Sequence, residues 1–469
     1  MPLNAEEFLY IQHLKNLSGI EHDRQVASDN RLLILNDDWK ELVLERLKKL
    51  VSDETYNNVA DFVNITVNPF KSIIEDISQV YALPPNRTFE GDEDKVEFWS
   101  TLYNELWFNE ILKVSNGYMN ALNETILYVV WRNGRPEVDV LTPNILTVLT
   151  ADNDATKPEK FFIKRRYDPN KDYIPDNTYW IVWTEGEHYM LDKNIKVVPF
   201  PDNKNMINPW GILPFVTLHR KLPVDSYWND TAGNDLYELA IIHGVKKLLD
   251  DFTRAYNSFK HPIVSGHLDE EPVGLVSSPD SILAFKGTDL NVVIADMQVA
   301  LDKLNDDRKA AIAAVANVYG VDWHLYETEH EESGKAKDIK NKKLLGKQRT
   351  QEEIFLRAEN ELFNIMKRIN SISTGKNPDA DKTEMSLKFT EPEPYIDPKT
   401  KLDMDEKEIA LDLKDKVDVF MERNQQYKGD RNAAEKRLLE IHESNQRFRD
   451  MRDASISEEL NRIELEEKE

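Results

Sequence analysis

The chain has 469 residues, no cysteine, 16 glycines and a formal net charge of −25. The lack of cysteine excludes a disulfide framework, a thiolate zinc site and a cysteine nucleophile, and the scarcity of glycine argues against glycine-rich phosphate-binding loops. The negative charge repels nucleic acid, so any contact with DNA would have to be local or transient. With no leader-like start and no apolar run near the roughly 20 residues that span a bilayer, we expect a soluble, non-exported protein without membrane contact.

The first quarter of the chain is expected to be mainly helical. Apolar residues at helical spacing, such as Trp39, Val43 and Leu47, occur before residue 52. A buried helix is predicted within residues 64–80, ended by the prolines at 84 and 85. After a charged stretch at 90–97, a further helix is predicted to carry large apolar side chains: Trp99, Leu102, Leu106, Trp107, Ile111 and Leu112.

The next segment, residues 125–215, has the pattern of antiparallel strands. Its four strongest apolar runs are residues 126–131, 161–165, 179–183 and 188–191. Asn133-Gly134 and Glu185-Gly186 stand where hairpin turns are expected. The sequence Asn-Pro-Trp-Gly-Ile-Leu-Pro-Phe at 208–215 then marks a boundary.

Two long amphipathic helices are predicted on either side of a short insertion. The first covers residues 230–259, with apolar residues three or four apart along its length. The second covers residues 295–319, where a near-heptad stripe is interrupted by Arg308. Between them, residues 261–293 contain short β-like runs at 262–264 and 281–285. Two such helices can lie antiparallel with the insertion at their far tip.

A polar loop is predicted at residues 321–337, followed by a third long helix at 338–369. Residues 385–390 could return as a strand to the earlier sheet, and the prolines at 392, 394 and 398 mark another boundary. The remaining residues have a polar helical pattern and end in an acidic tail at 458–469.

The predicted loop contains the only motif that suggests phosphate chemistry. Ser333-Gly334-Lys335 imitates part of a phosphate-binding loop, but Glu329 replaces its first glycine and Ala336 replaces the Mg²⁺-binding hydroxyl residue. Two interpretations stay open: a turn with solvated lysines, or a basic loop that contacts a polyanion. The second interpretation would use Lys335, Lys337, Lys340, Lys342 and Lys343.

Other candidate sites favour structural explanations. Residues 168–172 resemble the start of a calcium loop, but Tyr173 and Tyr179 replace the required Gly and Glu. The carboxylate clusters at 92–94 and 379–381 are typical of solvated linkers, and His243 is expected to be a packed residue of the first long helix. We therefore predict no catalytic residue, no metal and no cofactor.

The order of these segments, covering about residues 64–390, resembles the portal proteins of tailed bacteriophages. The boundary sequence at 208–215 is similar to the segment before the first stem helix of that family. Asn234-Asp235-Leu236 and Leu248-Leu249-Asp250-Asp251-Phe252 are similar to the start and middle of that helix, and Val67-Asn68-Pro69 through Tyr81, with Pro84-Pro85, to an early segment of the wing domain. The order of the segments carries the resemblance, because each motif alone is degenerate.

The resemblance implies an α+β portal fold. It would consist of a wing at 1–228, stem helices at 229–259 and 294–320, a clip at 260–293, a tunnel loop at 321–337, a long wing helix and returning strand at 338–394, and a helical crown with an acidic tail at 395–469. The tunnel-loop lysines would touch passing DNA. The clip residues Pro262, His267, Asp269, Glu270 and Glu271 would contact partner proteins.

Function and partners follow from the same resemblance. The chain would be a structural, non-enzymatic subunit of a homo-oligomeric ring, twelve-fold as in the family, at the capsid portal vertex of the virion after assembly in the host cytoplasm. Double-stranded DNA would pass through the channel without sequence-specific readout during packaging and ejection. Terminase, head-completion or adaptor proteins, the major capsid protein and scaffolding proteins would be its partners.

Two alternatives remain open at the level of sequence. The helices could form a bundle without a channel, in another virion or scaffold assembly protein. Alternatively, the carboxylates at 92–97 or 379–381 could serve a metal-dependent nuclease, because scattered carboxylate sites leave no local sequence signature.

Overall fold

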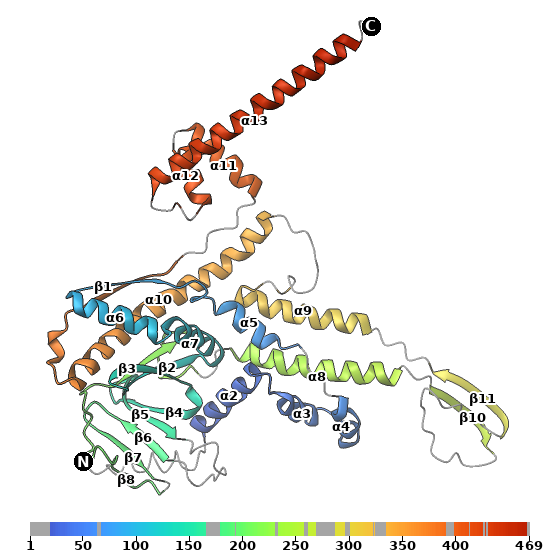
Figure 1. The fold of residues 1–469 in the computed structure, drawn as a ribbon. Helices are drawn as coiled ribbons and strands as arrows, with labels where there is room; N and C mark the ends of the chain where they lie inside the picture. The colour runs from blue at the N-terminus through green and yellow to red at the C-terminus, as the bar shows by residue number, and fades with distance from the viewer. Residues whose placement is uncertain are drawn as a thin grey trace. The chain divides into compact units, whose positions relative to one another are not determined.

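The computed structural model describes residues 19–62, 67–165, 179–192, 194–229, 233–257, 261–268, 287–295, 301–321, 323, 334–390, 398–411, 413–424, 427 and 430–466. The chain forms two compact units, Met1–Glu391 and Pro392–Glu469. The boundary between them falls three residues before the start predicted for the C-terminal segment. Helices and antiparallel sheets are mixed in the first unit, as the α+β class requires (Figure 1).

Short helices begin the described part of the first unit. They are α2 (Ile20–Leu35), α3 (Lys40–Lys48), α4 (Asp53–Val59), η1 (Ala60–Phe62) and α5 (Pro69–Ile77). The α5 helix begins where Asn68 Oδ1 accepts a hydrogen bond from the Lys71 backbone N–H, 3.0 Å away, and Pro69 occupies the first turn. The helical pattern before residue 52 and the helix within residues 64–80 are thus confirmed, whereas α4 and η1, between these two segments, were not predicted.

The region after the charged stretch differs from the prediction. Instead of one helix it forms two, α6 (Glu93–Glu105) and α7 (Phe108–Leu122). The break is at Trp107, whose backbone is left-handed at φ 54° and ψ 44°. No proline or glycine marks this break, which is why the apolar spacing alone suggested a continuous helix.

Two antiparallel sheets follow. One contains three strands in the order β3-β2-β9, and the other is a meander of five in the order β4-β5-β6-β7-β8. Their bounds are β2 Glu124–Arg132, β3 Arg135–Leu141, β4 Leu146–Ala151, β5 Asp154–Arg165, β6 Tyr179–Trp183, β7 His188–Leu191, β8 Val197–Val198 and β9 Phe215–His219, with the short helix η2 at Pro143–Ile145. All four predicted apolar runs are strands.

Both predicted hairpin turns are present. Arg132 pairs with Arg135 across Asn133 and Gly134, whose φ angles of 52° and 75° suit a two-residue hairpin. Trp183 pairs with His188 across the turn that contains Glu185 and Gly186. Strands β3, β4, β8 and β9 were not predicted, because their apolar runs are short or interrupted by polar residues.

The returning strand exists, but it does not join either of these sheets. Strand β12 (Glu384–Lys388) pairs only with β1 (Asn86–Glu90) in a separate two-stranded sheet, in which Thr88 lies opposite Ser386. The prediction missed β1 because alternating exposed and half-buried residues in a five-residue run give a weak signal. The short helix η5 (Pro378–Ala380) precedes β12.

The two long helices and the insertion between them are α8 (Asn234–Asn257), β10 (His261–Leu268), β11 (Gly287–Ala295) and α9 (Leu301–Tyr319). Strands β10 and β11 pair antiparallel, with His261 opposite Ala295. The second helix was predicted to begin at residue 295, but residues 287–295 form a strand. Its Val292, Val293 and Ile294 favour a strand because β-branched side chains lose freedom in a helix. The β-like run at 281–285 lies outside the described residues.

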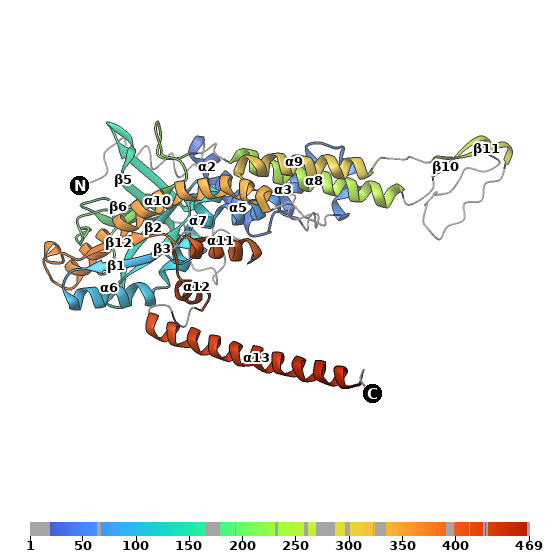
Figure 2. The same ribbon diagram turned by 90° about the horizontal axis from the view of Figure 1, so that it is seen from above.

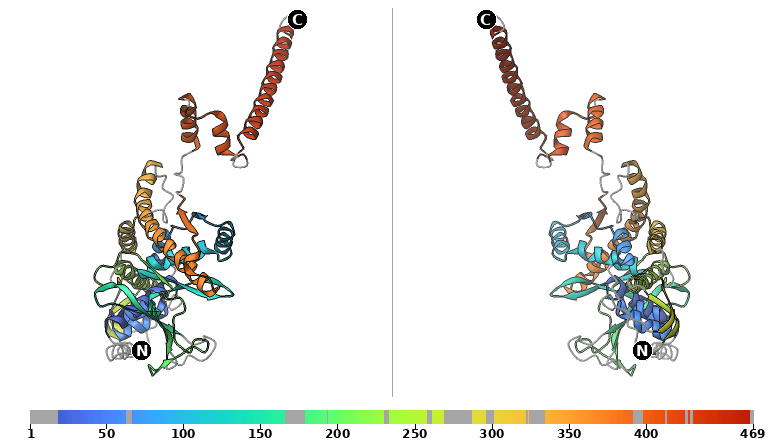
Figure 3. Two further views of the ribbon diagram at one scale, coloured as in Figure 1. Left: turned by 90° about the vertical axis from the view of Figure 1, so that its left-hand side faces the viewer. Right: turned by 90° about the vertical axis from the view of Figure 1, so that its right-hand side faces the viewer.

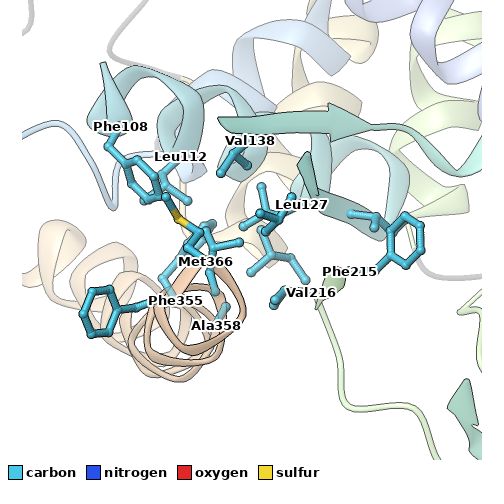
Figure 4. Close-up of a cluster of buried hydrophobic side chains, with 14 of the residues drawn as sticks. Phe108, Leu112, Leu127, Val138, Phe215, Val216, Phe355, Ala358 and Met366 are labelled. Atoms are coloured by element: carbon cyan, nitrogen blue, oxygen red, sulfur yellow. The ribbon is translucent and has the colours of Figure 1, made fainter. Parts of the chain in front are cut away.

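Helix α10 (Gly334–Ser373) packs against the three-stranded sheet and supplies much of the main core. Figure 4 shows Met366 of α10 among Leu112 of α7 and Leu127 of β2, with Ala358 near Val216 of β9. A second core joins α3, α5, α8 and α9. Figure 2 shows α8 and α9 side by side, as in Figure 1.

The second unit is helical where it is described. It consists of α11 (Pro398–Ala410), α12 (Lys416–Arg423) and α13 (Arg431–Glu466). Figure 3 shows α13 as one long continuous red helix that leads to the C-terminus. Asp415 caps α12 through a reciprocal capping box with Asp418. The α13 helix continues through most of the predicted acidic tail, to Glu466.

Candidate functional site

The antiparallel pair of α8 and α9 is fixed by polar contacts at one end and farther along its length. Close to the start of α8, the Tyr319 hydroxyl of α9 donates to Asp235 Oδ1 at 2.7 Å. Further along, Arg308 Nη1 lies 3.4 Å from Asp250 Oδ2 and its Nη2 donates to Asn305. The residue that interrupts the predicted apolar stripe therefore contacts the partner helix. Because the helices run antiparallel, the chain leaves for β10 and returns from β11 at the same end of the pair.

The buried faces of these helices differ from the predicted stripes. Ile242 on α8 is 43% exposed and Val318 on α9 is 62% exposed, although both belonged to those stripes. Small residues are buried instead: Ala240 and Gly244 on α8, Ala313 and Ala316 on α9. At Gly244 an added Cβ would lie 2.7 Å from Val43 Cγ2. Close helix packing thus selects small side chains, which a search for large apolar residues overlooks.

His243 is packed inside this second core, in agreement with the sequence interpretation. The side chain is 6% exposed, and its Nδ1 has no hydrogen-bond partner in the part of the chain that the structure describes. Burial lowers the pKa of His243 to about 4, and the positive charges of Arg308 and Lys247 add to this effect. The imidazole is therefore neutral at pH 7.

Only two of the five predicted clip residues can be located. Pro262 and His267 lie on strand β10, where Pro262 is opposite Ile294 and His267 is opposite Thr288. Register shifts between Ser265 and His267, so the strand is irregular just before the histidine. The other three residues, Asp269, Glu270 and Glu271, lie outside the described residues.

The predicted tunnel-loop lysines lie on α10. This helix begins at Gly334, four residues earlier than predicted, so Lys335 and Lys337 are helical rather than part of a loop. Residues 335–345 contain no proline or β-branched residue except Ile339, and Ala, Lys and Leu favour a helix. Of the predicted loop residues that precede α10, only Val321 and Trp323 lie within the described residues. Lys340, Lys342 and Lys343 follow on the same helix.

A lysine that the sequence interpretation did not single out connects α10 to the helix pair. Lys347 Nζ donates to the Val318 backbone oxygen of α9 at 2.5 Å and lies 5.3 Å from the centre of the Tyr319 ring. The same ring lies 5.0 Å from the Arg220 guanidinium carbon. These contacts fix α10 against the end of α9 where the predicted loop begins.

The middle of α10 carries a buried carboxylate. Glu359 is fully buried and accepts hydrogen bonds from the Tyr81 hydroxyl at 2.5 Å and from Arg87 Nε at 2.7 Å. Burial, and then the negative charge of Glu359, raise the pKa of Tyr81 well above its ordinary value. This paired, hydrogen-bonded carboxylate fixes α10 to Tyr81 and to strand β1, which contains Arg87.

One candidate carboxylate of the nuclease alternative, Asp381, has a similar structural role. Asp381 is buried, accepts a hydrogen bond from Trp99 Nε1 at 3.2 Å and two from Thr383, and lies 3.7 Å from Lys95 Nζ. Within the described ranges, no group of three or more His, Cys, Asp or Glu residues is arranged to hold a metal ion. None of the described helices combines the length and apolar character needed to cross a membrane.

A large open groove lies between α10 and the two sheets. Its volume is about 890 Å³. Basic side chains, Lys157, Arg357 and Arg368, share its walls with apolar ones, Leu213, Leu222 and Ile365, and with the acidic Glu185 and Glu361. Burial raises the pKa of Glu361, and the positive charge of Arg357 acts in the opposite direction. No sequence motif indicated this groove, because its residues come from four separated segments.

Comparison with known proteins identifies no family. No family model matches the chain, and no curated protein matches it. Among solved structures, a chain described as "Virion of native gene transfer agent (GTA) particle" is similar with a TM-score of 0.36 and 11% sequence identity. The similarity covers 74% of this chain and 86% of that chain.

Proposed function

We propose that this chain is a portal subunit of a tailed bacteriophage. Twelve copies would form a ring at one capsid vertex, serve as the channel for DNA packaging and ejection, and bind terminase and the head–tail connector proteins. One observation carries the proposal: the antiparallel helices α8 and α9 bracket the β10–β11 hairpin, and a 40-residue helix follows them. This is the order of stem, clip and long helix that the sequence resemblance implies.

The helix pair would form the stem. Its contacts at Tyr319–Asp235 and Arg308–Asp250 hold two antiparallel helices in one register, which suits a strut that carries load between two ends of a subunit. The chain between α8 and α9 emerges at one end of the pair. Pro262 and His267 on that inserted hairpin are accordingly proposed to contact terminase and, later, the head-completion proteins.

The first turns of α10 would contact the DNA. Lys347, farther along α10, contacts α9. The proposed DNA-contacting lysines precede it by at most twelve positions, or about 18 Å of helix at 1.5 Å per residue. They are Lys335, Lys337, Lys340, Lys342 and Lys343. A basic segment on an otherwise acidic protein would attract phosphates locally, while the remaining surface repels them and lets the duplex slide. Such contacts read no base sequence.

The proposal assigns no catalytic residue to this chain. Energy for DNA movement would come from a separate ATPase. The nuclease alternative has less support, because Asp381 already accepts hydrogen bonds from Trp99 and Thr383 and lies near Lys95. No specific observation favours the alternative of a scaffold protein without a channel.

The DNA contact can be tested by replacing both Lys335 and Lys337 with alanine. Rings should still assemble, because neither residue belongs to the stem contacts, while DNA packaged or retained per particle should fall at least threefold. Lys388→Ala, at an exposed position of β12, is the matched control and should package normally. Unchanged packaging by the double variant would remove these lysines from the mechanism.

A further inference from the structure

The turn between α6 and α7 exposes a tryptophan on a strained backbone. Trp107 is 74% exposed, and its φ of 54° lies in the left-handed region that bulky residues rarely adopt. Tryptophan is among the residues most enriched at the centres of protein interfaces. A large aromatic side chain held in water by an unfavourable backbone conformation suggests a function that requires it there.

Acidic side chains accompany this tryptophan. Asp94, Glu97, Phe98 and Glu105 line a pocket of about 410 Å³ along α6, together with Arg135 of β3, whose Nη1 donates to Glu105 Oε2 at 2.6 Å. Positions 94, 97, 98 and 105 recur at helical spacing and end two residues before Trp107. Three acidic residues and one basic residue give this surface a net charge of −2. We use the name aromatic–acidic surface for these pocket residues together with the exposed Trp107, which follows Glu105 by two positions: Asp94, Glu97, Phe98, Glu105, Arg135 and Trp107.

The groove beside α10 is complementary to it. Lys157, Arg357 and Arg368 face two acidic residues there, which leaves a net charge of +1, and Leu213, Leu222 and Ile365 supply apolar wall. Leu222 is 73% exposed. The groove, of about 890 Å³, is as large as a typical small-molecule site of about 300–1,000 Å³, so it has room for a single large side chain. We call these six residues the basic–apolar groove.

The two surfaces lie on opposite sides of α10. Arg357, Glu361 and Arg368 form one stripe of that helix along the groove. Phe363 packs its ring against Trp99 of α6, with centroids 5.1 Å apart. Positions 361 and 363 are about 200° apart around a helix of 3.6 residues per turn. One copy therefore presents its aromatic–acidic surface away from its own groove, as a head-to-tail contact between copies requires.

We propose that the aromatic–acidic surface of one copy of this chain docks into the basic–apolar groove of the next copy. Trp107 enters the apolar part of the groove, and the carboxylates of α6 meet the basic side chains of its walls. This proposal rests on the ring formation of the proposed function and specifies the surface through which neighbouring copies touch. A heterologous contact of this kind closes into a ring when its rotation closes.

Two variants test the contact from its two sides. Trp107→Asn combined with Glu105→Lys disables the aromatic–acidic surface, and asparagine tolerates the left-handed conformation, so the fold should persist. Lys157→Glu combined with Arg357→Glu disables the groove at two exposed positions. By sedimentation velocity, each variant alone should need at least a tenfold higher concentration than the unmodified protein to assemble. Far-UV circular dichroism and thermal melting check that each variant is folded.

Mixing the two variants gives the sharpest result. Each retains one intact surface, so an equimolar mixture should form one-to-one dimers and no larger rings. The control variant, Glu384→Lys with Lys388→Glu on exposed positions of β12, should assemble like the unmodified protein.

The outcomes separate this inference from the proposed function. Rings formed equally well by both variants and by the unmodified protein would overturn the docking proposal while leaving the portal proposal standing. An unmodified protein that stays monomeric up to high concentration would overturn the ring itself. A third outcome would also contradict the docking proposal: one variant no longer forms rings, yet the mixture of the two variants forms no dimers. The two surfaces would then not bind each other.

Discussion

Individual residues of the second core show how tightly α3 packs on α8. Gly244 faces Val43, and a Cβ added there would approach Val43 Cγ2 to 2.7 Å, a distance that real Cβ atoms essentially never show. The backbone of α8 is ordinary helix at this point, so glycine is present for space rather than for conformation. This residue therefore determines the separation of the two helices.

Replacing Gly244 by alanine should destabilise the protein by about 1–3 kcal/mol, the usual cost of overpacking a core. The control is Gly346→Ala on α10, where nothing lies within 4 Å of the added Cβ. That variant should be neutral or up to about 1 kcal/mol more stable, because alanine favours a helix. Urea unfolding of the two variants measures both; equal stability would show that α3 does not pack on α8 as described.

His243 makes stability depend on pH. Its folded pKa of about 4 lies below the ordinary value of 6.5, so the unfolded chain binds the proton more readily. The resulting stability is fully present above pH 6.5 and is lost as the pH falls toward 4. Between pH 7 and pH 5 the loss from this one residue should be about 2 kcal/mol.

His243→Leu should remove that part of the pH dependence. His188 keeps its own contribution, because burial lowers its pKa to about 4 as well. The measurement is the free energy of unfolding at pH 7 and pH 5. A His243→Leu profile as steep as that of the unmodified protein would contradict the buried neutral imidazole.

At the residue scale, sequence reasoning succeeded where local chemistry decides the outcome. Asn133-Gly134 adopts positive φ angles that these two residues tolerate best, so the hairpin followed from their identity. Trp107 adopts a positive φ that its identity disfavours. Such a position cannot be inferred from local propensity, because the preference of the residue itself points to a different conformation.

Among the elements, the α8–α9 pair contains the most informative polar contact. Arg308 and Asp250 are both largely buried, at 14% and 16% side-chain exposure. Burial raises the pKa of Asp250 even though Arg308 and Arg254 act in the opposite direction. The cost of removing water from the carboxylate thus exceeds what its basic neighbours return. We infer that the pair specifies the register of the helices more than it stabilises them.

Arg308→Met alone should therefore destabilise the protein by about 1–3 kcal/mol, because the largely buried carboxylate of Asp250 is left without its partner. Adding Asp250→Leu should recover most of that loss, since two apolar residues need no pairing. Chemical denaturation of both single variants and the double variant completes the cycle. A double variant that is less stable than either single one would show that the pair stabilises the fold.

Element types were predicted better than element boundaries. The helices at 230–259 and 295–319 correspond to α8 and α9, but strand β11 occupies the first residue of the second predicted helix. Similarly, α10 begins four residues before its predicted start. Residue spacing reports which face of an element is buried, whereas its ends depend on capping and on neighbours distant in sequence.

At the scale of the whole molecule, the pairing of distant segments was beyond sequence reasoning. Strand β12 pairs with β1, almost 300 residues earlier, and Glu359 of α10 forms an ion pair with Arg87 of β1. The groove beside α10 likewise gathers residues from four segments. Local patterns do not encode which segments pair with each other. The expected arrangement of the elements therefore came from the order of the segments and from the family resemblance.

The central claim is that identical copies of this chain form a closed ring. In the proposed ring, the aromatic–acidic surface of each copy would meet the basic–apolar groove of the next. The α8–α9 pair also has exposed apolar residues, such as Ile242 and Val318. Negative-stain electron microscopy of the purified full chain, with native mass spectrometry of the same sample, tests the claim directly. The account predicts rings of one size with a central hole and a mass of twelve subunits. Monomers, open filaments or bundles without a hole would contradict it.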